Sequence, residues 1–164
     1  MHTRALKIAG GPLLLVRPLR PGDTATVLAV FERLGEESRR ARFNGPKPSL
    51  ADDELRRLAR VDGRHHVLVA HVWGDSRPAA IARLVRDGAT AEIAFAVADQ
   101  YQGLGIGSRL TGELCADARA AGIREITALV ASDNPAALAL LRRIASVLDV
   151  RLEGPELSIR AAIA

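Results

Sequence analysis

The sequence predicts a mixed α/β domain in which helices flank a central, mostly antiparallel sheet. Three strand-like apolar runs follow one another with short connections, at residues 66–72, 80–85 and 91–97. A long helical pattern at residues 105–121 then separates the third run from a fourth, as in a βαβ crossover. Hydrophobic residues make up 48% of the chain and aromatic residues only 3%, so Ala, Val, Leu and Ile must build the core.

The first third of the chain is expected to hold one strand and two helices. Residues 13–17 form a short apolar strand, and helical spacing of apolar residues follows from 25 to 34. Residues 36–49 are charged and contain two prolines, which indicates a loop with a single helical turn. Ser49 is placed to cap the second helix, whose apolar residues repeat up to Val61.

The last third of the chain predicts a strand, a helix and a hairpin. Asn134 precedes a proline at the expected start of a helix, where proline is favoured. The expected elements are a strand at 125–131, a helix from 134 to about 146, and a hairpin of strands at 150–153 and 157–163. A chain of 164 residues fits one domain, so residues 1–164 are expected to form a single domain.

Composition and charge exclude several classes of function. No run of 18 apolar residues is present, so no membrane segment is expected, and the N-terminus lacks the apolar stretch of a signal peptide. Cys115 is the single cysteine and cannot form an internal disulfide, which favours a cytoplasmic location. The net charge is +4, but acidic residues are interspersed and no basic stripe with aromatic residues occurs, so no nucleic-acid partner is expected.

The segment with the clearest chemistry lies between the third strand and the long helix and reads QGLGIGS, residues 102–108. Glycines let backbone N–H groups approach a ligand without interference from a Cβ, and a helix N-terminus adds unpaired donors and a positive dipole end. The segment therefore predicts a cradle for a pyrophosphate, with a plain strand-to-helix loop as the alternative. A dinucleotide fingerprint would need Gly where Ser108 stands, and a Walker A loop would need a Gly-Lys pair.

The segment matches the pattern Q/R-x-x-G-x-G/A and resembles the pyrophosphate-binding motif of the GNAT superfamily of N-acetyltransferases. Residues 17–23 (RPLRPGD), 37–39 (ESR) and 91–95 (AEIAF) further resemble the GNAT domain of bacterial protein-lysine acetyltransferases. The resemblance implies the GNAT acyl-CoA N-acyltransferase fold, acetyl-CoA as cosubstrate, no metal, and acetyl transfer to a primary amine, above all a protein lysine. Homodimers are common in this family, so the resemblance also makes a homodimer possible. The implied acetyl-CoA contacts are Val97, Asp99, Gln102, Gly103, Leu104, Gly105, Ile106, Gly107, Ser108 and Asn134.

Glu92 is the candidate general base. Strand alternation places Ile93, Phe95 and Val97 on an apolar core face and Glu92 on the other face among alanines, where a pantetheine arm would find room. An amine with a pKa of about 10.4 is protonated at neutral pH and must lose a proton before it attacks a thioester. A partly desolvated glutamate can accept that proton, and Glu92 matches the catalytic position of the similar lysine acetyltransferases. The alternative is a surface glutamate paired with Arg83.

Two departures from the family pattern leave roles open. Many members carry a tyrosine in the helix after the asparagine, whereas the single tyrosine here, Tyr101, precedes the glycine-rich loop, so solvent could protonate the leaving thiolate. Asn134 is a candidate contact to CoA and could cap its helix at the same time. Three functions therefore compete: a protein acetyltransferase, an acetyltransferase for small amines, and a CoA-binding sensor without turnover.

The remaining polar residues carry weaker signals. His65 and His66 are adjacent on one strand, so they point to opposite faces and cannot chelate a metal together. Either His66 or His71 could relay a proton, although an ordinary strand position is favoured. Cys115 lies among small apolar residues of the long helix and is expected to be buried and unreactive.

Overall fold

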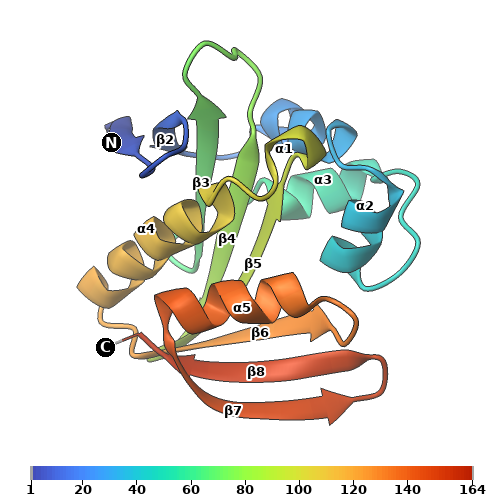
Figure 1. Ribbon diagram of the computed structural model, residues 1–164, viewed down its shortest axis with the longest axis vertical. Coiled ribbons are helices and arrows are strands. Elements are labelled where there is room, and N and C mark those ends of the chain that lie inside the picture. The colour runs from blue at the N-terminus through green and yellow to red at the C-terminus, as the bar shows by residue number, and fades with distance from the viewer. Residues whose placement is uncertain (1, 164) are drawn as a thin grey trace.

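An eight-stranded mixed sheet forms the centre of the computed structural model, which describes residues 2–163 (Figure 1). Its strand order is β1-β2-β3-β4-β5-β6-β8-β7, and neighbouring strands are antiparallel except β5 and β6, which are parallel. The mixed α/β class predicted from the sequence is therefore confirmed. The elements are β1 (Arg4–Lys7), β2 (Leu13–Pro18), α1 (Thr24–Glu32), α2 (Glu36–Phe43), α3 (Asp52–Leu58), β3 (His65–Val72), β4 (Ala80–Asp87), β5 (Thr90–Val97), the 3-10 turn η1 (Asp99–Tyr101), α4 (Ile106–Ala120), β6 (Glu125–Ala131), α5 (Pro135–Ile144), β7 (Ser146–Glu153) and β8 (Glu156–Ala162).

Helices cover both faces of the sheet and divide the core into two parts. The larger part lies under α4 and α5, where Leu110 and Leu114 of α4 pack against alternate residues of the sheet. The smaller part lies under α1 and α3, which pack against Val67 and Val69 of β3. Because β3 is buried on both faces, its central residues form a continuous apolar run rather than an alternating one.

The sheet opens between β5 and β6. Only three residue pairs join the two strands, from Thr90 with Glu125 to Glu92 with Thr127. Beyond Glu92 the strands diverge, so that β3, β4 and β5 run steeply in Figure 1 whereas β6, β8 and β7 cross below them. Phe95 and Val97 point to the α4 side as predicted, but they stay half-buried because β6 no longer runs beside them.

Several element boundaries differ from those predicted. Residues 36–43 form the helix α2 and not a loop with one turn; α2 has few apolar residues, and acids in its first turn and Arg40 and Arg42 in its last turn stabilise it instead. Ser49 does not cap α3, which begins after Ala51. Strand β1 was not expected, and β7 begins at Ser146, where the sequence predicted the end of a helix.

No helix in residues 2–163 is both long and apolar enough to cross a membrane.

Candidate active site

The glycine-rich segment, residues 102–108, follows β5 and η1 and enters α4 at Ile106. Gly103 and Gly105 adopt positive φ angles of 76° and 82°, which side-chain-bearing residues rarely adopt. Gly105 is the N-cap of α4 and makes no side-chain capping bond, whereas Ile106 is buried in the core and anchors the first turn. The segment therefore turns twice in the left-handed region before it becomes helical.

The backbone donors of this loop are left free. The N–H groups of Gly103, Leu104 and Gly105 donate to no other group in the described part of the chain. The hydrogen bond from the Arg109 N–H to the Gly105 carbonyl, at 3.0 Å, begins the i→i−4 bonding of α4. The N–H groups of Ile106, Gly107 and Ser108 lie before it in the first turn, where a helix has no partner for its donors. Exposed, unpaired donors at the positive end of a helix are what a pyrophosphate requires, and the loop thus fits this part of acetyl-CoA.

Gly107 has a different role, because its backbone is helical. A Cβ at this position would lie 3.0 Å from Leu140 of α5 and 3.3 Å from Val97 of β5. The absence of a side chain lets α5 approach the start of α4, beside the opening between β5 and β6. The third glycine of the motif therefore favours close packing and does not serve an unusual φ angle.

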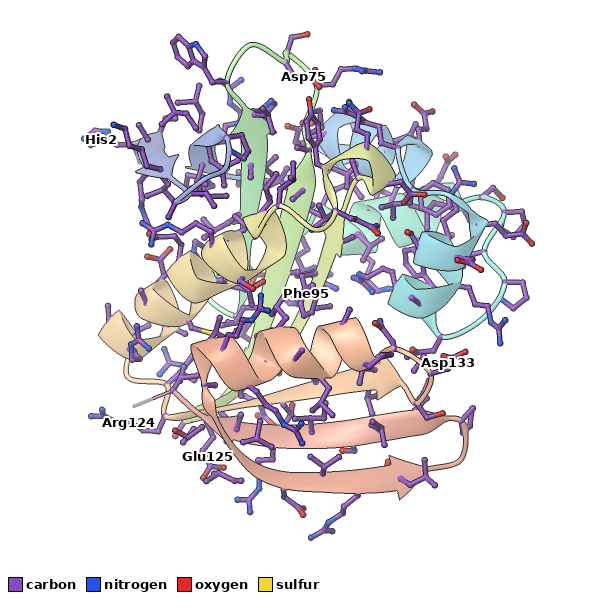
Figure 2. The ribbon with its side chains drawn as sticks, viewed as in Figure 1. His2, Asp75, Phe95, Arg124, Glu125 and Asp133 are labelled. Carbon is purple, nitrogen blue, oxygen red and sulfur yellow. The ribbon has the colours of Figure 1, made fainter. Side chains whose placement is uncertain are left out.

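A buried ion pair holds η1 in place. Arg33, whose side chain is 8% exposed, donates to Asp75 at 2.9 Å, and the Tyr101 hydroxyl donates to the same carboxylate oxygen at 2.8 Å. The Arg33 guanidinium also lies over the Tyr101 ring, 5.2 Å from its centroid. Asp75 lies on the connection between β3 and β4, at the top of the view in Figure 2. This network ties the residue just before the loop to two other elements, and the sequence offered no sign of it.

Asp75→Asn is expected to lower the free energy of unfolding by about 1–3 kcal/mol, because it leaves Arg33 buried without a charged partner. The Arg77 backbone N–H, the Tyr101 hydroxyl and Arg33 hold the pKa of Asp75 well below its usual range. This stabilisation is complete above the unfolded pKa of about 3.9 and is lost as the pH falls through the lower folded pKa. The wild type and Asp75→Asn should therefore differ more in their free energy of unfolding at pH 7 than at pH 3, as urea unfolding measures it. An equal difference at both pH values would contradict the role assigned to Asp75.

Two of the expected pantetheine contacts already have partners inside the protein. The Gln102 side-chain amide donates to the Val97 carbonyl at 3.0 Å and to the Ser38 hydroxyl of α2 at 2.9 Å. The Asp99 N–H donates to the Arg33 carbonyl at 3.2 Å. Gln102 thus links the end of β5 to α2, a link that the sequence did not reveal because residues 36–43 were not expected to be helical.

Glu92 lies on β5 at the last residue pair before the strands diverge. Its side chain is exposed rather than partly desolvated as the sequence suggested, so any desolvation has to come from bound substrates. Arg83 lies on the neighbouring strand β4, on the same face of the sheet as Glu92, and Arg42 lies on α2. Burial lowers the pKa of Arg42 to about 10, the charge of Arg83 acts in the same direction, and the carboxylate of Glu92 opposes both.

The two arginines border a small cavity on the face of the sheet to which Glu92 belongs. The cavity has a volume of about 30 Å³, and its other walls are mainly apolar side chains of α1, α2, α3, β4 and β5. The Arg83 guanidinium donates to the Arg57 carbonyl at 3.1 Å, but its Nε has no partner among the described residues. Arg42 and Arg83 are thus candidate acceptor-site residues. The sequence suggested Arg83 as a partner of Glu92, and it placed Arg42 in a basic run that would disfavour a polycationic acceptor.

Asn134 caps α5, because its Oδ1 accepts a hydrogen bond from the Ala137 N–H at 3.2 Å. Its side-chain NH₂ remains available to a ligand. Figure 2 shows the labelled neighbour Asp133 beside the start of α5, and Phe95 in the space between α4 and α5. The start of α5 therefore borders the same opening as the glycine-rich loop.

The histidines and the cysteine lie away from this opening. His65 pairs with Asp62 at 2.7 Å, and His66 pairs with Asp117 of α4 at 2.8 Å. Among the described residues, no group of three or more His, Cys, Asp and Glu side chains could hold a metal ion. Cys115 is fully buried, and burial raises the pKa of its thiol to about 11, so the thiol is unreactive as expected.

Comparison with known proteins agrees with this geometry. Residues 31–145 match the model of the acetyltransferase (GNAT) family. The acetyltransferase Pat of Mycolicibacterium smegmatis is 35% identical over 147 residues, which is 87% of this chain but 44% of the relative, so the chain spans less than half of that protein's length.

Solved structures show the same fold. The GNAT domain of S. lividans PAT superposes with a TM-score of 0.86 at 26% identity, over 98% of this chain and 96% of that domain. The structure of yncA from Salmonella typhimurium, solved with its cofactor acetyl-CoA, has a TM-score of 0.66 at 19% identity over 92% of this chain and 94% of that one. The glycine-rich loop, the opening beside it and these matches lead to one conclusion: the chain belongs to the acetyltransferase (GNAT) family.

Proposed function

We propose that the chain transfers the acetyl group of acetyl-CoA directly to a primary amine, most of all the side chain of a protein lysine. The observation that carries this proposal is the position of Glu92. It ends the parallel pairing of β5 and β6, and the strands part beyond it towards the free N–H groups of the glycine-rich loop. A thioester whose pyrophosphate lies on that loop would extend along β5 towards this carboxylate.

The loop would bind the pyrophosphate through the N–H groups from Gly103 to Ser108, and the Asn134 side-chain NH₂ would contact the CoA beside it. The pantetheine would compete with Gln102 for the Val97 carbonyl, and the Asp99 N–H would have to exchange its bond to Arg33. Loading the site thus requires the Gln102 side chain to move, which also releases its bond to Ser38 of α2.

Acetyl-CoA supplies an activated acyl group. Glu92 would take a proton from the ammonium form of the acceptor, directly or through water, and the neutral nitrogen would then attack the thioester carbonyl. A C–N bond forms, the C–S bond breaks with its electron pair leaving on sulfur as a thiolate, and the nitrogen releases its second proton to solvent to give the neutral amide. Because α5 (PAALALLRRI) contains no tyrosine, the thiolate would be protonated by solvent.

A protein acceptor is supported by the likeness to S. lividans PAT and the mycobacterial Pat. A small amine is the second candidate, because the fold alone does not choose an acceptor. A CoA sensor without turnover is the third, favoured by the missing tyrosine. The expected cytoplasmic location and the single domain over residues 1–164 stay predictions.

The test is a thiol-release assay with acetyl-CoA against lysine peptides, folded proteins and small amines, together with calorimetry of acetyl-CoA binding. Saturable turnover on the lysine peptides or proteins supports the proposal. Turnover confined to small amines replaces the protein acceptor with the second candidate. Binding without turnover on any acceptor favours the sensor, and no binding at all would contradict the assigned role of the glycine-rich loop.

A further inference from the structure

A second cavity, of about 480 Å³, lies beside the C-terminal end of α4. It is bordered by the start of β3, the end of β4 and the last turns of α4. Figure 1 shows α4 extending from the glycine-rich loop towards the lower left of the view, and its 15 residues span about 22 Å. The volume lies within the range of small-molecule pockets, roughly 300–1,000 Å³. None of the residues assigned above to acetyl-CoA or to the acceptor lines it.

Part of the lining is apolar. The buried side chains of Leu84 on β4, Ala118 on α4 and Ile123 between α4 and β6 border the cavity, and Pro18 and Ala121 extend this surface. Covering such a surface with the hydrocarbon or aromatic part of a ligand is favourable, because it removes apolar area from water.

Two arginines that line the cavity are opposed across neighbouring strands. The Arg86 backbone N–H donates to the Arg64 carbonyl at 2.7 Å, which continues the register of β3 and β4 by one step beyond the pair of His65 with Val85. Strand alternation places Arg86 on the same face as the buried Leu84, under α4. Like charges directly opposite each other in a sheet are destabilising, so an anion bound between the two arginines would offset their repulsion.

The terminal NH₂ groups of both arginines are available to a ligand. The Arg64 Nε donates to the Arg86 carbonyl at 3.3 Å, and the Arg86 Nε donates to the Gly88 carbonyl at 2.9 Å. These bonds orient the side chains, whereas no carboxylate among residues 2–163 pairs with either guanidinium group. Arg64 is exposed and Arg86 half-buried, so a ligand can reach both from solvent. A guanidinium group presents parallel N–H donors that match the oxygens of a carboxylate or a phosphate.

The two acids that line the cavity already have partners within the protein. Asp62 accepts hydrogen bonds from backbone N–H groups of the residues that follow it and lies 2.7 Å from the His65 ring nitrogen. Asp117 pairs with Arg4 at 2.7 Å and with His66 at 2.8 Å. Their negative charges are therefore compensated locally, and the cavity keeps the two facing arginines for an incoming anion.

We propose that this cavity binds a small organic anion, with its carboxylate or phosphate group between Arg64 and Arg86 and its apolar body against Leu84, Ala118 and Ile123. The site lies at the other end of α4 from the glycine-rich loop. Binding there does not depend on acetyl transfer, so the proposal stands or falls separately from the proposed function.

The first test compares four probes by calorimetry: naphthoate, naphthyl phosphate, naphthylmethylamine and inorganic phosphate. The two naphthyl anions are expected to bind with a Kd below about 1 mM, and whichever binds more tightly identifies carboxylate or phosphate as the preferred group. Inorganic phosphate lacks the apolar body and should bind at least about 10-fold more weakly, and the cationic amine should not bind. No binding of either anion, or equal binding of the amine, would overturn the proposal.

The second test locates the site with matched variants. Arg64→Gln and Arg86→Gln should each weaken binding of the naphthyl anions about 5-fold or more, because each removes charge-assisted hydrogen bonds that solvent partly screens. Arg56→Gln is the control, since Arg56 is exposed on α3 and loses the same charge away from the cavity. Unchanged affinity in Arg64→Gln and Arg86→Gln, or an equal loss in Arg56→Gln, would place the anion elsewhere.

The third test separates this site from the acetyl-CoA site and checks the fold. The affinity of wild type for naphthyl phosphate should be the same with and without saturating acetyl-CoA, whereas competition would place the anion on the glycine-rich loop and overturn the proposal. Naphthyl phosphate should also raise the thermal unfolding temperature of wild type but not that of the double variant Arg64→Gln with Arg86→Gln. An equal rise in both proteins would contradict binding between the two arginines.

Discussion

Glu92→Gln is expected to lower the turnover number at least about 100-fold, because glutamine keeps the shape of the side chain but cannot accept a proton. The affinity for acetyl-CoA should stay unchanged, since the free N–H groups that would bind the pyrophosphate lie at the other end of the opening. Thiol release under saturating acceptor measures turnover, and calorimetry measures acetyl-CoA affinity independently of it. Because Glu92 is proposed to act in the chemical step and not in binding, the KM for acetyl-CoA should change little.

Glu32→Gln is the control for this change. Glu32 is exposed at the end of α1 and loses the same charge without lying in the opening, so its activity should equal that of the wild type. If Glu92→Gln kept full turnover, Glu92 would be an ordinary surface residue near Arg83, and the base would have to be sought elsewhere. Loss of turnover with intact CoA binding would instead eliminate the sensor, which has no turnover to lose.

Gly105→Val is expected to weaken acetyl-CoA binding at least about 30-fold. Gly105 has a φ of 82°, where a side chain costs about 1–2 kcal/mol and a β-branched one more. The valine would also stand among the N–H groups proposed to hold the pyrophosphate, and each lost hydrogen bond to a charged group costs about 1.5–3 kcal/mol. Calorimetry of acetyl-CoA binding gives the change in affinity directly.

Gly112→Ala, on the same helix, separates a local effect on the loop from a general effect on α4. Gly112 is helical, and a Cβ there would meet its nearest neighbour, Ile144, at 4.0 Å, so alanine fits and should leave affinity unchanged. Thermal unfolding of both variants shows whether either change destabilises the fold as a whole. Acetyl-CoA affinity unchanged in a well-folded Gly105→Val protein would exclude the loop as the pyrophosphate site.

The elements that the sequence predicted well are those whose pattern is local. The α4 helix and strands β4, β5 and β6 were located within two residues, because apolar periodicity and nearby turn residues mark them directly. The family was also recognised from residues 102–108 and their position between a strand and a helix, and the match over residues 31–145 confirms it. The roles of individual site residues, including Glu92 and Asn134, stay predictions.

The elements that were missed are held by interactions that no local pattern displays. Helix α2 is stabilised by its terminal charges and by the bond from Gln102 to Ser38, and β1 by the ion pairs of Arg4 with Glu113 and Asp117 on α4. Each of the latter pairs joins residues more than a hundred positions apart. Periodicity within a short window contains no information about such partners.

The sequence by itself therefore determined the class of fold, the family and the place of the glycine-rich loop, since these depend on hydrophobic spacing and on glycines at fixed positions. Only the tertiary structure decided how far β5 and β6 run together, that Arg42 and Arg83 stand near Glu92, and that Gln102 occupies the Val97 carbonyl. These are relations between separate elements. They follow from how the twisted sheet and the helices pack, which is set by contacts distant in the chain.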